Sequence, residues 1–192
     1  MIKKDEILNI FKRTKALLEG HFVLTSGRHS SSYFQCAKVL QYPHYLDMFS
    51  TAIADNFKNE KPDVVISPAV GGIVLGTKVG IKLSCRTIFA ERQDGKMVIR
   101  RGFEIAENEK VLIIEDVITT GGSVKEVINL LDKINAQIIG VGVLVDRSNG
   151  KAKLHNNQFS MVKLDAVSYS AKDIPDELAA KPIQKPGSRY LL

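Results

Sequence analysis

The sequence contains no tryptophan and only two cysteines, Cys36 and Cys85, which lie far apart and form no CxxC pair. This spacing excludes a zinc site built from cysteine pairs and a disulfide framework, and two reduced thiols are typical of a cytoplasmic protein. The most apolar stretch, residues 138–145, is much shorter than the roughly 18 residues that a membrane span needs. We therefore expect a soluble, cytoplasmic protein without a membrane segment.

With 192 residues, the chain is long enough for one full-sized domain, and two independent domains are not expected. Its residues are 44% hydrophobic and 25% charged, as in ordinary globular proteins. Lys and Arg number 27 against 21 Asp and Glu, which gives a net charge of +6. This surplus suits a phosphorylated small molecule or a nucleic acid, but many proteins carry such a charge without any anionic partner.

Helical spacing of apolar residues appears twice near the N-terminus. The first pattern predicts an amphipathic helix rather than a signal peptide and comprises Ile7, Ile10, Phe11, Leu17 and Leu18. The second begins at Pro43, a favourable first helical residue, and continues to Phe57.

Further along the chain, apolar strands alternate with helices. Strands are predicted at residues 63–67, 111–115 and 138–146, and helical patterns cover 72–83 and 124–134. Continuous apolar strands in such an alternation are typical of a parallel sheet covered on both faces. The predicted fold class is therefore α/β, with a core at residues 43–160, an N-terminal segment at 1–42 and a C-terminal segment at 161–192.

Residues 86–92 and 97–105 form a predicted β-hairpin, because the Asp94–Gly95 pair between them is a strong hairpin signal. In the second strand, alternation would point Arg100 and Arg101 to opposite faces.

The stretch VLIIEDVITTGGSV, residues 111–124, is predicted to carry the functional chemistry. It follows an apolar strand, and ligands of open α/β sheets bind at the carboxyl ends of strands. Gly121 and Gly122 would let backbone N–H groups converge on an anion at the start of the next helix. The hydroxyl groups of Thr119, Thr120 and Ser123 would add donors, which completes a predicted phosphate cradle.

The acidic pair Glu115 and Asp116 cannot bind phosphate directly, because the like charges repel. Carboxylates can, however, accept hydrogen bonds from vicinal hydroxyl groups or lie near a metal-bound substrate. An acidic pair next to a phosphate cradle therefore indicates a ribose 5-phosphate group.

The same stretch closely resembles the phosphoribosyl-diphosphate binding motif of type I phosphoribosyltransferases. Within that family the likeness is greatest to the short orotate phosphoribosyltransferases, and it extends over HFVLTSGRHSSSYFQC (21–36), SPAVGGI (67–73), FAERQDGKMVIRRGFEI (89–105) and VLVDRSNG (143–150). The resemblance implies one domain over 1–192 with the type I fold: a central, mostly parallel sheet flanked by helices, a small hood from the terminal segments and a catalytic β-hairpin.

It also implies transfer of the phosphoribosyl group to orotate in pyrimidine (UMP) biosynthesis. The implied phosphoribosyl-diphosphate contacts are Val70, Gly71, Glu115, Asp116, Val117, Ile118, Thr119, Thr120, Gly121, Gly122 and Ser123. Orotate would be bound by Thr119, Arg147, Tyr33 and Phe34, and a planar Arg fork suits its carboxylate.

The resemblance further implies that Arg92 and Lys96, near the hairpin tip, act on the pyrophosphate. Mg²⁺ would bind mainly through substrate oxygens and water, without an all-protein metal site. A homodimer that shares the hairpin across subunits is expected. Better-known relatives have lysines where this chain has Thr25 and Gly71, and a longer hairpin loop with a histidine. Candidates to supply the missing cations are Arg92, Lys96, Arg100 and Arg101.

Two alternatives share the central motif. A purine or xanthine phosphoribosyltransferase would use late aromatic residues such as Tyr169 or Tyr190, but the SSSYF and VDR segments weigh against it. A nucleic-acid-binding regulator would need a basic stripe, whereas Lys and Arg are scattered, so no nucleic-acid partner is expected. The histidines, His21, His29, His44 and His155, show no ligand or triad spacing, and we assign them no chemistry.

Overall fold

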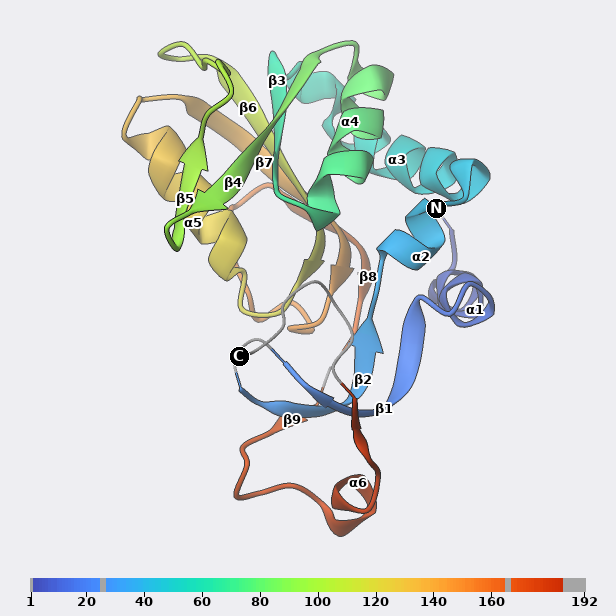
Figure 1. The fold of residues 1–192 in the computed structure, drawn as a ribbon. Helices are drawn as coiled ribbons and strands as arrows, with labels where there is room; N and C mark the ends of the chain where they lie inside the picture. The colour runs from blue at the N-terminus through green and yellow to red at the C-terminus, as the bar shows by residue number, and fades with distance from the viewer. Residues whose placement is uncertain (1, 25–26, 165–166, 185–192) are drawn as a thin grey trace. The chain divides into compact units, whose positions relative to one another are not determined.

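The computed structural model describes residues 2–24, 27–164 and 167–184. These residues form two compact units (Figure 1). The larger unit is made of residues 42–164, and the smaller one combines residues 2–41 with the described C-terminal residues.

The larger unit is built on a six-stranded sheet with the order β5-β4-β3-β6-β7-β8. Its strands are β3 (Val64–Pro68), β4 (Arg86–Gln93), β5 (Lys96–Ile99), β6 (Lys110–Ile118), β7 (Gln137–Asp146) and β8 (Gln158–Lys163). All neighbouring strands are parallel except β4 and β5, which form the hairpin. The mostly parallel sheet confirms the α/β prediction, and it brings the carboxyl ends of β3, β6 and β7 to one edge.

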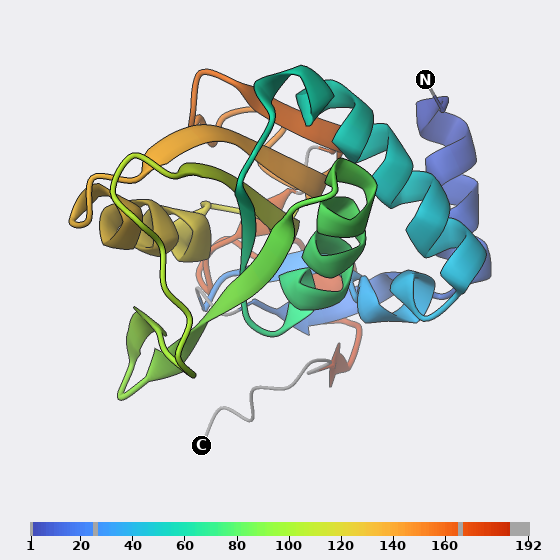
Figure 2. The ribbon, with the colours of Figure 1, turned by 90° about the horizontal axis from the view of Figure 1, so that it is seen from above.

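Helices cover both faces of this sheet (Figure 2). One face carries α3 (Pro43–Phe57) and α4 (Gly71–Leu83), which pack against each other. The other face is covered by α5 (Gly122–Asp132). A short 3-10 helix, η1 (Lys58–Glu60), follows α3. On the α5 side, Val111 and Ile113 of β6 join one core cluster with Val124 and Val127. The residue between them, Leu112, is also fully buried, so both faces of β6 are covered and its run of apolar residues is explained.

The smaller unit has a four-stranded sheet with the order β10-β1-β2-β9. Its elements are α1 (Lys4–Arg13), β1 (Leu17–Val23), β2 (His29–Phe34), α2 (Ala37–Leu40), β9 (Ser168–Tyr169), α6 (Asp176–Ala179) and β10 (Ile183–Gln184). The prediction that Leu17 and Leu18 continue the first helix is wrong. The helix ends at Arg13, Lys15 has a left-handed φ of 54°, and the two leucines begin β1.

Two further boundaries and one strand differ from the sequence prediction. The hairpin's second strand ends at Ile99 rather than 105, and β6 continues through the acidic pair to Ile118. The strand β8 was not predicted, because its half-buried residues lack a continuous apolar run. Across the described residues, no helix is long and apolar enough to cross a membrane.

Candidate active site

The carboxyl ends of β6 and β7 bring together two residues that the sequence analysis assigned to orotate. Ile118 lies opposite Asp146 in the parallel register, and the backbone N–H of Arg147 donates to the carbonyl of Ile118 over 2.9 Å. Thr119 therefore follows β6 directly beside Arg147. The Arg147 side chain is only 5% exposed, whereas Thr119 is exposed.

The turn between β3 and α4 approaches the acidic pair closely. A Cβ atom on Gly71 would lie 2.5 to 2.7 Å from three carboxyl atoms of Asp116. One on Gly72 would lie 2.9 Å from the carbonyl oxygen of Ile114 and 3.1 Å from Oε1 of Glu115. Only glycine allows the start of α4 to pack this tightly on the end of β6. The predicted pyrophosphate turn and the acidic pair are therefore neighbours.

At the end of β6, Glu115 is buried and Asp116 is half-buried. Burial, together with the negative charge of Asp116, raises the pKa of Glu115 well above its ordinary value. Burial also raises the pKa of Asp116, against the opposing effect of its side-chain hydrogen bond with Glu115. The backbone orients the carboxyl groups: Glu115 Oε1 accepts from the N–H of Asp116 at 3.0 Å, and Asp116 Oδ1 accepts from the N–H of Val117 at 2.8 Å.

The predicted phosphate cradle forms the turn from β6 into α5. Thr119 and Thr120 are exposed, and Gly121 precedes the helix with a φ of 73°, a conformation that favours glycine. A Cβ on Gly121 would also lie 2.5 Å from Leu154 Cδ2. No described side chain caps the start of α5. The first N–H groups of a helix have no intrahelical partner, so this end can bind an anion. The Ile118 side chain is buried in the core, which leaves only its backbone for a ligand.

Comparison with known proteins agrees with this arrangement. The model of the phosphoribosyl transferase domain matches residues 42–174. The chain belongs to the phosphoribosyltransferase family.

Relatives of high identity cover almost the whole chain. Orotate phosphoribosyltransferase of Chlorobium phaeobacteroides is 58% identical over 98% of this chain and 97% of its own length. That of Caldanaerobacter subterraneus is 47% identical over 99% of this chain and 100% of its own.

A solved structure, orotate phosphoribosyltransferase from Aeropyrum pernix, shares the fold with a TM-score of 0.66 and 23% identity, covering 82% of this chain and 93% of that one. An adenine phosphoribosyltransferase from Thermoanaerobacter pseudethanolicus has a TM-score of 0.62 at 16% identity, covering 69% of this chain and 88% of its own. The fold by itself therefore does not select the base.

In this phosphoribosyltransferase, Asp146 is a site-supporting residue that the sequence analysis missed. Its Oδ1 accepts from the N–H and the hydroxyl of Ser148, at 2.8 and 2.6 Å, and its Oδ2 accepts from the N–H of Gly150 at 3.1 Å. These bonds fix the turn that begins with Arg147. The available signal was an Asp followed two residues later by Ser, which is typical of a side chain that organises its own turn.

The hairpin that carries Arg92 and Lys96 turns through Asp94 and Gly95, whose φ values of 51° and 78° fit a two-residue hairpin turn. Lys96 is exposed, and Arg92 bonds to Glu126 of α5. The expectation that Arg100 and Arg101 diverge is wrong. The strand ends before them, Arg101 has a left-handed φ of 65°, and both guanidinium groups bind Glu91.

The predicted base-stacking residues Tyr33 and Phe34 lie on β2 in the smaller unit. The Phe34 ring is buried and packs edge-on against Phe11, with ring centroids 5.9 Å apart. The Tyr33 ring is half-buried and lies 5.7 Å from that of Phe22. A role in orotate binding stays a prediction for both. Thr25 and Tyr190 lie outside the described residues.

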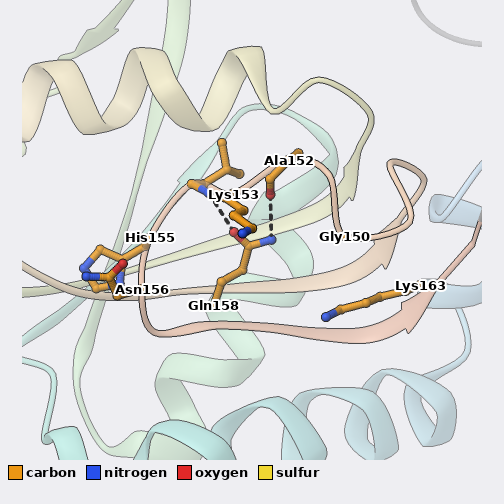
Figure 3. A pocket seen from close by; sticks show the side chains of 8 residues that line it. Gly150, Ala152, Lys153, His155, Asn156, Gln158 and Lys163 are labelled. Carbon is orange, nitrogen blue, oxygen red and sulfur yellow. Dashed lines mark hydrogen bonds between the residues drawn. The ribbon is translucent and has the colours of Figure 1, made fainter.

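A pocket of about 480 Å³ opens between the β7–β8 connection and β8 (Figure 3). It is lined by Gly150, Ala152, Lys153, Leu154, His155, Asn156, Gln158 and Lys163. Inside this loop, the Gln158 amide accepts from the N–H of Leu154 at 2.9 Å and donates to the carbonyl of Ala152 at 3.1 Å. These bonds hold Leu154 against Gly121, so the loop supports the predicted phosphate cradle.

Proposed function

We propose that this protein transfers the 5-phosphoribosyl group from 5-phosphoribosyl 1-diphosphate to orotate, giving orotidine 5-monophosphate and pyrophosphate in pyrimidine (UMP) biosynthesis. The observation that carries this proposal is the identity, up to 58% over nearly the whole chain, with relatives named orotate phosphoribosyltransferase. The neighbouring positions of Thr119 and Arg147 beside the acidic pair support it. A cytoplasmic location follows from the same proposal.

The ribose 5-phosphate moiety would bind at the end of β6. Glu115 and Asp116 accept hydrogen bonds from the two ribose hydroxyl groups, and burial makes these bonds strong because water does not compete. The 5-phosphate binds to the turn from Thr119 to Ser123, where the dipole of α5 favours an anion.

Orotate would be recognised through its carboxylate and its imide carbonyl groups. The buried Arg147 offers a planar pair of donors that fits the carboxylate, and the Thr119 hydroxyl donates to the ring. Tyr33 and Phe34 are the aromatic residues that we propose for contact with the orotate ring.

The chemistry is displacement of pyrophosphate from C1 of the ribose by a ring nitrogen of orotate. An oxocarbenium-like transition state needs little from a general base, so the protein holds both reactants in line, binds the leaving group and excludes water.

The residues present fit a Mg²⁺ ion held mainly by the substrate. The acidic pair offers the oxygen ligands that Mg²⁺ prefers, yet the described residues contain no group of three or more His, Cys, Asp or Glu that could hold a metal alone. When bound, Mg²⁺ neutralises charge on the pyrophosphate group. Glu115 and Asp116 are the residues that would face it.

The pyrophosphate would bind the backbone N–H groups of Val70 and Gly71 at the start of α4, with Arg92 and Lys96 of the hairpin closing over it. We further propose a homodimer that shares the hairpin across subunits. An exposed apolar stripe on the α4 segment supports an interface there, with Val70, Val74 and Ile81 exposed by 75, 49 and 62%. Mixing the inactive Lys96→Ala and Asp116→Asn proteins tests this proposal. Restored activity means that the hairpin acts across subunits, and no recovery contradicts sharing.

The test of the activity is the ultraviolet absorbance of orotate mixed with phosphoribosyl diphosphate, Mg²⁺ and the protein, with adenine, hypoxanthine, xanthine and uracil in parallel. Mg²⁺-dependent consumption of orotate alone is expected. Consumption of another base would leave the phosphate turn intact but refute the base assignment to Arg147. If no base is consumed, the catalytic proposal fails and nucleic-acid binding becomes the function to test.

A further inference from the structure

The hairpin residue Arg92 is held by an acid that no step of the proposed reaction uses. Its Nη1 donates to Glu126 Oε2 at 2.9 Å, and its Nη2 donates to Glu126 Oε1 at 2.6 Å. Nη1 also donates to the carbonyl of Gly95, at the hairpin turn, over 2.9 Å. This two-pronged pairing uses the fork of donors with which an arginine would bind pyrophosphate.

Glu126 lies on α5, the helix whose first turn is the phosphate cradle. It follows Gly122, the first helical residue, by about one turn, and β5 of the hairpin packs against α5. One helix therefore carries both the proposed phosphate site and the carboxylate that holds the hairpin. The side chains of Arg92 and Glu126 are 31 and 37% exposed, so water can replace either partner and the pair can exchange at low cost.

We propose that Glu126 is a positioning residue that holds Arg92 on α5 when pyrophosphate is absent and competes with pyrophosphate for it. This inference rests on the proposed function and adds to it a residue that sets the affinity for the leaving group. The Arg92 fork cannot serve the carboxylate and a phosphate group at once. Binding of pyrophosphate must therefore break the pair with Glu126, whichever subunit's site receives the hairpin.

The experiment measures the Kd of magnesium pyrophosphate by calorimetry for the wild-type protein, Glu126→Gln, Arg92→Gln and the double variant. Glu126→Gln keeps the size of the side chain but removes its charge, and we expect pyrophosphate to bind about two- to fivefold more tightly, the range of an exposed ion pair. Arg92→Gln should weaken binding. Adding Glu126→Gln to Arg92→Gln should change nothing further, because the competition needs both partners.

Glu109→Gln is a matched control, because Glu109 forms a similar two-pronged pair with Arg86 at the other end of the strands. It should leave the Kd of pyrophosphate unchanged, and thermal unfolding of every variant checks that the fold is kept.

If Glu126→Gln leaves pyrophosphate binding unchanged or weakens it, Glu126 does not compete for Arg92 and the inference is overturned. A tightening that persists without Arg92 would overturn it as well. Orotate consumption by the same wild-type sample separates this result from a failure of the proposed function. An active wild-type protein with no tightening in Glu126→Gln refutes the exchange alone. If the wild-type protein neither consumes orotate nor binds pyrophosphate, the proposed function fails and the exchange falls with it.

Discussion

Gly71→Ala is the substitution that most directly tests the geometry of the site. The added Cβ would lie 2.5 Å from Oδ2 of Asp116 and 2.7 Å from its Cγ, well inside the contact distance of about 3.5 Å. The Asp116 carboxyl group cannot simply turn away, because its Oδ1 is fixed by the N–H of Val117 at 2.8 Å. Either this carboxyl group or the start of α4 must move.

The expected effect on stability is moderate and that on binding is large. Overpacking costs about 1–3 kcal/mol of unfolding free energy, and part of it is offset because alanine favours a helix over glycine by up to about 1 kcal/mol. A displaced Asp116 would lose a hydrogen bond between a charged group and a ribose hydroxyl, worth about 1.5–3 kcal/mol. The affinity for phosphoribosyl diphosphate should therefore fall by about ten- to a hundredfold.

Gly80→Ala provides the matched control. Gly80 is also in α4, and its Cβ would overlap Cγ2 of Thr87, but it lies far along the helix from the acidic pair. Urea unfolding and calorimetric titration with phosphoribosyl diphosphate and Mg²⁺ should show a loss of stability for both variants and a loss of affinity for Gly71→Ala alone. Wild-type affinity in Gly71→Ala, or an equal loss in Gly80→Ala, would refute the reasoning.

Three further predictions concern the acids and the arginine. Asp116→Asn should weaken binding of phosphoribosyl diphosphate by at least about tenfold and leave the circular dichroism spectrum unchanged, so normal affinity would argue against the ribose assignment. The pKa of Glu115 is raised in the fold, so its contribution to stability is complete below the ordinary carboxyl pKa and is lost as the pH rises through the raised pKa. Glu115→Gln should therefore unfold at a higher urea concentration than the wild-type protein at pH 8, and the gap between their urea midpoints should be smaller at pH 4. A gap that does not change with pH would contradict burial as the cause of the raised Glu115 pKa. Arg147→Lys keeps the charge but loses the planar fork of donors. Steady-state kinetics should therefore show a KM for orotate at least about tenfold higher, with unchanged affinity for phosphoribosyl diphosphate. Equal losses for both substrates would count against a base-specific role.

Much of the fold could be predicted from the sequence because its signals are local. The run from Val111 to Ile114 is apolar at every position, as a strand covered on both faces requires, and Pro43 marks a helix start that the structure confirms. The Asp94–Gly95 turn is equally local, since the two residues themselves adopt the positive φ values of the hairpin. The turn from Thr119 to Ser123 belongs to the same class, because its glycines and hydroxyl groups are contiguous.

The differences arise where tertiary contacts or single backbone angles decide the structure. Leu17 and Leu18 keep helical spacing with α1, but a left-handed Lys15 ends the helix before them. The periodic pattern also cannot reveal that Arg101 leaves the strand.

Pairs formed between distant segments are invisible to a local reading. The contact of Gly71 with Asp116 and the pair between Arg92 and Glu126 each join separate elements of the larger unit. The sequence analysis assigned no role to Glu126. Both contacts involve residues that the sequence analysis assigned to pyrophosphate, so this part of the candidate site is the one whose geometry needed the structure.

The acidic pair shows how the fold accommodates a site that works against its own stability. Burying Glu115 next to Asp116 raises the pKa of both carboxyl groups, which means that ionising them costs free energy in the folded protein. The pair stays in place because the rest of β6 is fixed between two covered faces, with Val111, Leu112 and Ile113 fully buried. A more exposed pair would be less costly, but its oxygen atoms would already be bound to water. In the proposed function, the same burial would favour hydrogen bonds between the carboxyl groups and the ribose hydroxyl groups, because less water competes for the carboxyl oxygen atoms.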